Sequence, residues 1–314
     1  DTGSFGLRVL ASALDSLELP PVTAAGGKPL AECGLFASGI SWGSVRSSDV
    51  HIGGETAAGL PVQVVNDSAI PPAPPACASI AGDFGVSAHA NGILGIGVLT
   101  QDCGPACAAS ASPGMYYSCD ATHCAASVAP LASQVANPVA SFGADNNGAV
   151  IALPAIPLTG VRVATGTLTF GIGTRANNQL GSATVYTTDA HGSLDTTFRG
   201  VRYSGFFDTG SNGLFFVDPS QPDCAGGNGF YCPVTTQNLS ATITSTTGVS
   251  NTVSFTVEGL QLVSGSAIAA PIAGATAAMG SVFDWGLPFF FGRTVFVAMT
   301  GAATPAGAGP YVAF

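Results

Sequence analysis

Two aspartates stand at the head of the same short motif, one in each half of the chain. Asp1-Thr-Gly-Ser-Phe-Gly-Leu7 and Asp208-Thr-Gly-Ser-Asn-Gly-Leu214 agree at six of seven positions. One Asp-Thr-Gly-Ser is as typical of a turn as of a functional site. Two copies, each followed by Gly-Leu and the second preceded by Phe206-Phe207, indicate instead a duplicated domain with half of a site in each copy.

Two carboxylates that are held close together cannot both ionise, so one pKa rises and the pair shares a proton. The ionised member can then take a proton from water while the protonated member donates to a substrate carbonyl. We therefore predict that Asp1 and Asp208 form a catalytic pair for hydrolysis without a covalent intermediate.

Three residues after each aspartate are suited to support the pair, namely Thr2, Gly3, Ser4, Thr209, Gly210 and Ser211. The glycines allow backbone N–H groups to approach the carboxylates. The serine hydroxyls can hydrogen-bond the outer carboxylate oxygens. We expect each threonine hydroxyl to bond to the backbone of the other copy, which would fix the separation that a shared proton requires.

Charged residues make up only 8% of the chain, against about 25% in a typical domain. The formal net charge is −10, with Lys28 as the one lysine, so a nucleic-acid partner is not expected. At acid pH the carboxylates become neutral and few charges remain, which favours stability in acid. Genome composition is an equally good explanation of the uncharged surface.

The eight cysteines favour an oxidising compartment and disulfide bonds. The spacing of Cys103 and Cys107, and of Cys119 and Cys124, also resembles a loose zinc site, which we consider less favoured. The sequence predicts one specific bridge, Cys224–Cys232, across a glycine-rich loop. The four histidines show no metal-ligand spacing and are interpreted as ordinary surface residues.

The chain begins inside a motif that needs a hydrophobic strand before it, as Tyr203–Phe207 provides for the second copy. We therefore expect an upstream strand and a targeting signal, and a protein that is secreted or lies in the periplasm or cell envelope. The most apolar run, Trp285–Met299, is too short to span a membrane and contains Arg293. We expect a monomer without an integral membrane segment.

Many Val, Ile, Thr and Phe residues between glycines and prolines predict short strands and tight turns. We expect a hairpin over residues 35–54, strands at 60–65, 166–172, 183–188 and 197–203, and a hairpin of 241–247 with 252–257 that 259–263 continues. Residues 128–136 are the best helix candidate. An Asn- and Gly-containing stretch places the lobe boundary near residue 178, which gives an N-terminal lobe of residues 1–178 and a C-terminal lobe of residues 179–314.

These features together resemble the pepsin-type aspartic peptidases, and within them a bacterial branch of the fold. The two Asp-Thr-Gly-Ser segments match the active-site loops of that family. Phe36-Ala-Ser-Gly39 and Ile52-Gly-Gly54 resemble its flap hairpin. Asn91–Gly97 and Gly286–Met299 resemble the apolar segments that run behind the two loops.

The resemblance implies an all-β, two-lobed pepsin-like acid protease fold with pseudo-twofold symmetry and a few short helices. It also implies an aspartic endopeptidase with an acid pH optimum, a polypeptide substrate and no cofactor. The flap residues that would close over substrate are Phe36, Ser38, Gly39, Ile40 and Trp42. The chain differs from the family in carrying Phe36 where the flap has tyrosine and Arg8 where a tryptophan follows the first loop. The alternative is a catalytically silent pepsin-fold protein that binds a polypeptide or a cell-envelope partner.

Overall fold

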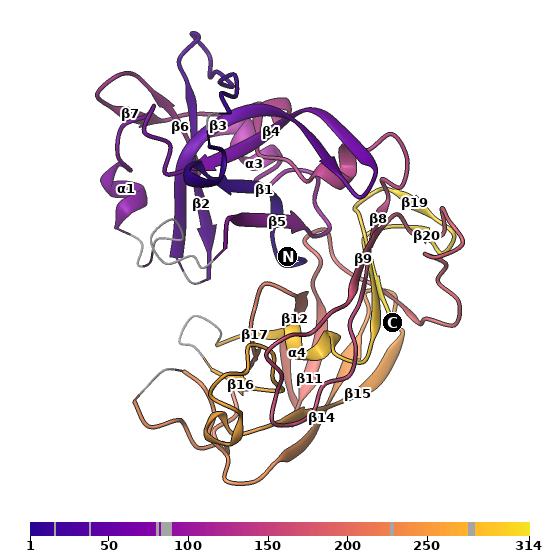
Figure 1. Cartoon of the computed structure of the whole chain (residues 1–314). Helices are drawn as coiled ribbons and strands as arrows, with labels where there is room; N and C mark the ends of the chain where they lie inside the picture. The colour runs from indigo at the N-terminus through magenta and orange to yellow at the C-terminus, as the bar shows by residue number, and fades with distance from the viewer. Residues whose placement is uncertain (16, 38, 80–81, 83–89, 227–228, 276–279) are drawn as a thin grey trace. The chain divides into compact units, whose positions relative to one another are not determined.

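The structure is a computed structural model of residues 1–314, and it describes all of them except residues 16, 38, 80–81, 83–89, 227–228 and 276–279 (Figure 1). The chain divides into two compact units. The N-terminal unit is Ser4–Gly143, and the C-terminal unit is Ala144–Phe314 together with Asp1–Gly3. The first motif is therefore split, and its aspartate belongs to the same unit as Asp208.

The N-terminal unit is built on a seven-stranded sheet in the order β5-β1-β4-β3-β2-β6-β7 (Figure 1). Its strands are β1 (Phe5–Leu10), β2 (Leu30–Phe36), β3 (Gly39–Ile52), β4 (Glu55–Val65), β5 (Gly92–Ile96), β6 (Tyr116–Cys119) and β7 (Cys124–Ala126). The short helices α1 (Pro75–Ala78) and α3 (Pro105–Ala109) lie in its connections.

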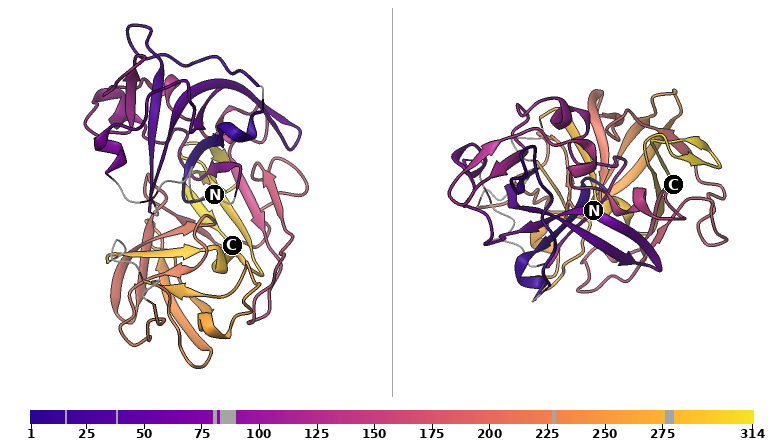
Figure 2. Two further views of the ribbon diagram at one scale, coloured as in Figure 1. Left: turned by 60° about the vertical axis from the view of Figure 1, so that its left-hand side comes forward. Right: turned by 90° about the horizontal axis from the view of Figure 1, so that it is seen from above.

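The hairpin predicted over residues 35–54 is present as β2 and β3, with Phe36 paired to Gly39. Strand β3 then turns at Gly53-Gly54, both in the left-handed region, and pairs along its length with β4. The resulting ribbon can be followed in both views of Figure 2. Glycines are needed at this turn because side-chain-bearing residues avoid positive φ.

The C-terminal unit contains a seven-stranded sheet in the order β15-β14-β11-β12-β17-β13-β16 and a five-stranded sheet in the order β10-β21-β18-β8-β9. The first is formed by β11 (Leu194–Phe198), β12 (Val201–Asp208), β13 (Leu214–Phe215), β14 (Gln237–Thr244), β15 (Ser250–Val257), β16 (Ala273–Gly274) and β17 (Val282–Gly286). The second is formed by β8 (Gly148–Ala152), β9 (Thr167–Phe170), β10 (Val185–Thr187), β18 (Thr294–Ala298) and β21 (Tyr311–Ala313). Helix α4 (Leu287–Phe290) follows β17, and β19 (Ala303–Thr304) pairs with β20 (Gly307–Ala308).

The pairing of strands repeats in the two units, as the duplicated motif predicts. Strand β1, which follows the first Asp-Thr-Gly-Ser, pairs parallel with β4 and antiparallel with β5. Strand β13, which follows the second, pairs parallel with β16 and antiparallel with β17. Because Arg8 and Phe215 hold the same place in the two copies, their partners Ile93 and Asp284 are equivalent as well.

An aromatic cluster packs the C-terminal unit beneath the second motif. Phe283 stacks on Phe216 with ring centroids 4.7 Å apart, and Trp285 stacks on Phe207 at 6.2 Å. These four side chains are buried, which fixes the end of β12, and therefore Asp208, on a rigid base.

All eight cysteines are in disulfide bonds: Cys33–Cys77, Cys103–Cys107, Cys119–Cys124 and the predicted Cys224–Cys232. The disulfide interpretation of the cysteine-rich segment is therefore confirmed. Four bridges indicate folding in an oxidising environment. No helix among the described residues is long and apolar enough to cross a membrane.

Three predicted elements differ from the structure. Residues 197–203 are not one strand, because Arg199 and Gly200 both have positive φ and make the turn between β11 and β12. Residues 128–136 contain only the 3₁₀ turn Leu131–Ser133, since Gln134 bonds through its side chain to neighbouring loop backbone. Residues 259–263 form a 3₁₀ turn at Leu260–Leu262 rather than continuing the hairpin.

Residues 144–178 group with the second half of the chain, because β8 pairs along its whole length with β18. The two compact units reflect which residues pack together. The predicted lobe boundary near residue 178 stays a prediction.

Candidate active site

The two motifs meet within the C-terminal unit through their threonines. The Thr2 hydroxyl donates to the carbonyl of Phe207 at 2.9 Å and accepts from the backbone N–H of Thr209 at 3.0 Å. The backbone N–H of Thr2 donates to the Thr209 hydroxyl at 3.1 Å. The hydrogen bonds expected of the threonines are thus present, and they join residues that are 207 positions apart in the chain. Thr2 is buried, which protects these bonds from water.

Each carboxylate lies against the glycine of the other motif. A Cβ atom added to Gly210 would lie 2.7 Å from Cγ of Asp1, and one added to Gly3 would lie 2.8 Å from Oδ2 of Asp208. Such distances are too short for a side chain, so only glycine allows this approach. Asp1 and Asp208 therefore lie close to each other.

The motif backbones present donors to the carboxylates. Asp1 Oδ1 accepts from the N–H of Gly3 at 2.8 Å, and Asp208 Oδ1 accepts from the N–H of Gly210 at 2.7 Å. The Ser211 hydroxyl donates to the other oxygen of Asp208, Oδ2, at 2.8 Å. These bonds orient each carboxylate.

Ser4, the remaining predicted support, belongs to the N-terminal unit. Its backbone carbonyl accepts from the N–H of Gly97, which holds the start of β1 beside the end of β5. The role predicted for its hydroxyl stays a prediction.

The paired motifs can perform acid–base chemistry on a bound water. The two carboxylates, each with a matching backbone donor, form a near-symmetric arrangement. No cofactor is needed for this step. Among the described residues no group of three or more His, Cys, Asp or Glu side chains could hold a metal ion.

A further carboxyl group beside the second motif was missed by the sequence analysis. Asp284 lies in the middle of β17 and is fully buried. Burial, and to a smaller extent the nearby charge of Asp208, raise its pKa to about 8, while Ser211 acts in the opposite direction. The signal in the sequence is an aspartate inside the apolar run Val282-Phe-Asp-Trp285.

The predicted flap residues lie around the β2–β3 hairpin of the N-terminal unit. Phe36 and Gly39 are paired across the hairpin, and the buried Ile40 follows. The Trp42 indole is 6% exposed and donates to the carbonyl of Pro71, so it belongs to the core of the unit. Ser38 lies outside the described residues.

Arg8 contacts the β2–β3 hairpin from β1. Its guanidinium lies over the Phe36 ring, 5.2 Å from the centroid, and is 3.0 Å from Asp102. It also forms an ion pair with Glu32. Glu32 is fully buried, which raises its pKa well above the usual range, with Arg8 acting against that shift.

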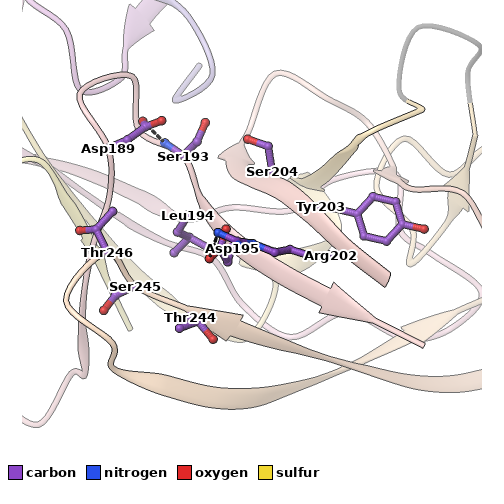
Figure 3. A pocket seen from close by; sticks show the side chains of 10 residues that line it. All are labelled: Asp189, Ser193, Leu194, Asp195, Arg202, Tyr203, Ser204, Thr244, Ser245 and Thr246. Carbon is purple, nitrogen blue, oxygen red and sulfur yellow. Dashed lines mark hydrogen bonds and ion pairs between the residues drawn. The ribbon is translucent and has the colours of Figure 1, made fainter. Parts of the chain in front are cut away.

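A separate hollow of the C-terminal unit lies beside β11 and β12 (Figure 3). Its walls carry mostly carboxylates and hydroxyls, from Asp189, Ser193, Leu194, Asp195, Arg202, Tyr203, Ser204, Thr244, Ser245 and Thr246. Asp195 forms an ion pair with Arg202 at 2.6 Å, and Asp189 accepts from the N–H of Ser193 at 2.9 Å, so the acidic groups are already occupied. Neither Asp1 nor Asp208 lines this hollow.

Comparison with known proteins agrees with this geometry at the level of the fold. The crystal structure of aspartic proteinase from Irpex lacteus is similar, with a TM-score of 0.50 and 16% sequence identity. The similarity covers 99% of this chain and 87% of that one, and it shows that the chain has the two-lobed, all-β pepsin-like fold. No curated protein is significantly similar to the chain in sequence.

A family model described as "Protein of unknown function (DUF3443)" matches residues 1–314, and the chain belongs to that family.

Proposed function

We propose that this protein is an aspartic endopeptidase in which Asp1 and Asp208 activate a water molecule for attack on a peptide bond. The observation that carries the proposal is the reciprocal contact of the two motifs. Each aspartate lies against the glycine of the other copy, and the threonine hydroxyls join their backbones. An arrangement that serves only as a turn has no need of this reciprocity.

In the proposed mechanism one aspartate is ionised and accepts a proton from the water. The other is protonated and donates to the substrate carbonyl oxygen as the tetrahedral intermediate forms. The roles then reverse when the amine leaves. The backbone donors of Gly3 and Gly210 hold the carboxylates in place through both steps.

The flap residues Phe36 and Gly39, with Ser38 between them in sequence, are proposed to contact substrate. Ile40 and Trp42 are buried and are proposed to support the hairpin. A secreted or periplasmic location and a polypeptide substrate complete the proposal.

The test is cleavage of a diverse peptide library by the full chain between about pH 2 and 6, read by mass spectrometry. We expect cleavage by the wild type and none by Asp208→Asn, since the amide has the same shape but cannot carry the negative charge. Asp195→Asn, which changes a carboxylate of the polar hollow, is the matched control and should cleave like the wild type. A folded wild type that cleaves no peptide would favour the catalytically silent binding protein instead.

A further inference from the structure

Asp284 shares one face of the sheet with Asp208. In the parallel pairing of β12 with β17, Phe206 lies opposite Asp284 and Asp208 lies opposite Gly286. Paired residues of neighbouring strands point to the same face, as do residues two apart on one strand. Gly286 has no side chain to stand between the two carboxyl groups.

The neighbours of Asp284 within the sheet are apolar. Its register neighbours on both sides are phenylalanines, Phe206 on β12 and Phe215 on β13, and its side chain is fully buried. Neither carboxyl oxygen forms a hydrogen bond within the described part of the chain. A buried polar group without a partner is unusual and calls for an explanation.

The protonation state of Asp284 follows from these surroundings. With its pKa raised to about 8 by burial and by the charge of Asp208, the group is a neutral carboxylic acid at acid and neutral pH. The neighbouring strand β12 carries two charged groups, Arg202 and Asp208. Arg202 forms an ion pair with Asp195, and the charge of Asp208 is the one that raises the pKa of Asp284. Asp284 therefore has an O–H to donate.

Ser211 is the acceptor that the site provides. A hydroxyl has one proton and two lone pairs, and Ser211 uses its proton on Asp208 Oδ2 at 2.8 Å. Within the described residues no group donates a hydrogen bond to Ser211 Oγ. Ser211 is also the polar side chain close enough to act on the pKa of Asp284.

We propose that Asp284 is a positioning residue of the site, whose protonated carboxyl donates to Ser211 Oγ and so directs the Ser211 hydroxyl to Asp208. The proposal rests on the proposed peptidase function and adds a third carboxyl group to it. If Asp284 were ionised, it would compete with Asp208 for the Ser211 proton. The neutral acid instead strengthens the bond to Asp208 through a chain of two hydrogen bonds in an apolar surrounding.

The first copy of the motif provides a control for the role of Asp284. The equivalent position in the first copy is Ile93, which faces Arg8 as Asp284 faces Phe215. Asp284→Ile therefore gives the second copy the side chain that the first copy has. Asp284→Asn keeps both the shape and the ability to donate to Ser211.

The first measurement is an NMR titration of the full chain labelled at aspartate Cγ, compared with Asp284→Asn. We expect one carboxyl signal that stays protonated to about pH 8 and is missing from the variant. In Asp208→Asn this signal should titrate at lower pH, because the opposing negative charge is gone. Titration of Asp284 in the ordinary range of aspartate, or no response to Asp208→Asn, would overturn the proposal.

The second measurement is a double-mutant cycle on kcat with Ser211→Ala. Asp284→Ile should lower kcat by about tenfold in the wild type, the size of one good hydrogen bond, but by less than about twofold when Ser211 is absent. Asp284→Asn should retain kcat within about threefold. Equal losses with and without Ser211 would reduce Asp284 to a packing residue and contradict the proposal.

The two measurements separate the hypotheses. A wild type that cleaves nothing ends the peptidase proposal and with it any positioning role. The titration still decides whether a neutral acid lies beside Asp208. A wild type that cleaves peptides but shows Asp284 ionised at pH 6 overturns the role of Asp284 alone.

Discussion

At the scale of residues, the site depends on two glycines as much as on two aspartates. Gly3 and Gly210 each leave room for the carboxylate of the other motif. The sequence alone predicts that these glycines allow a close approach to a carboxylate. It does not predict that each glycine serves the opposite aspartate, because that follows from how residues 1–3 join the C-terminal unit.

Gly210→Ala should reduce kcat by about a hundredfold or more, because its Cβ would lie 2.7 Å from Asp1 Cγ and displace that carboxylate. Steady-state kinetics at acid pH would measure this loss. Gly265→Ala, at a position with open space around the new Cβ, is the control and should behave like the wild type. Full activity in Gly210→Ala would show that the reciprocal packing is unimportant.

The raised pKa of Asp284 predicts how stability depends on pH. Its pKa is 3.8 when exposed in the unfolded chain and about 8 when folded, so between these values the folded state holds the extra proton. The free energy of unfolding should therefore fall by up to about 1.4 kcal/mol per pH unit through this window, with the contribution complete below about pH 4 and lost above about pH 8.

Urea unfolding of the wild type and Asp284→Asn at several values between pH 4 and 8 would measure this effect. As pH rises, the free energy of unfolding of the wild type should fall steadily relative to that of Asp284→Asn. If the unfolding free energies of the two proteins change in parallel between pH 4 and 8, Asp284 is ionised in the folded protein and the prediction is wrong.

At the scale of elements, the sequence predicts regular hairpins well and connections poorly. Alternating residues in 241–247 and 252–257 correctly indicate the β14–β15 hairpin. The turn at Arg199-Gly200 is missed because arginine is uncommon at positive φ, and local pattern alone cannot show that the fold imposes it. The helix predicted over residues 128–136 is absent because backbone groups of this segment bond to other parts of the fold, which local pattern cannot show either.

Arg8 is the residue that joins elements of the N-terminal unit. It lies between Glu32 of β2 and Asp102 of the cysteine-rich segment, and both carboxylates are buried. Arg8→Met should cost about 3–5 kcal/mol of unfolding free energy, because it leaves two buried acidic groups without a cation. Its contact with Phe36 means that the β2–β3 hairpin should loosen as well.

Chemical denaturation measures the cost of Arg8→Met, and Lys28→Met is the control. Lys28 is 55% exposed and pairs with Asp120 at the surface, so its loss should leave the unfolding free energy nearly unchanged. Similar losses in the two variants would contradict the role given to the buried network.

At the scale of the whole molecule, a duplicated motif and its neighbours were enough to predict the pepsin-like fold, which the structure and its similarity to a solved aspartic proteinase confirm. The disulfide Cys33–Cys77 could not be predicted, because its partners lie 44 residues apart and are joined by the packing of α1 near β3. Asp284 was missed because the sequence shows an aspartate inside an apolar run but not that this run lies beside the second motif.

The long and short disulfides should contribute differently to stability. Replacing Cys33 and Cys77 by alanine should cost roughly 4 kcal/mol in the chain-entropy treatment, since they close a loop of 44 residues. Replacing Cys103 and Cys107, which are 4 residues apart, should cost roughly 2 kcal/mol. Thermal unfolding of the two double variants tests this order, and a reversed order would contradict it.

The central claim is that Asp1 and Asp208 share one proton as a catalytic pair, and the pH dependence of kcat/KM tests it most directly. Activity requires one carboxylate charged and one neutral, so the account predicts a bell-shaped profile with both apparent pKa values on the acid side of neutrality. A profile with a single ionisation, or a bell that persists unchanged in Asp208→Asn, would contradict it.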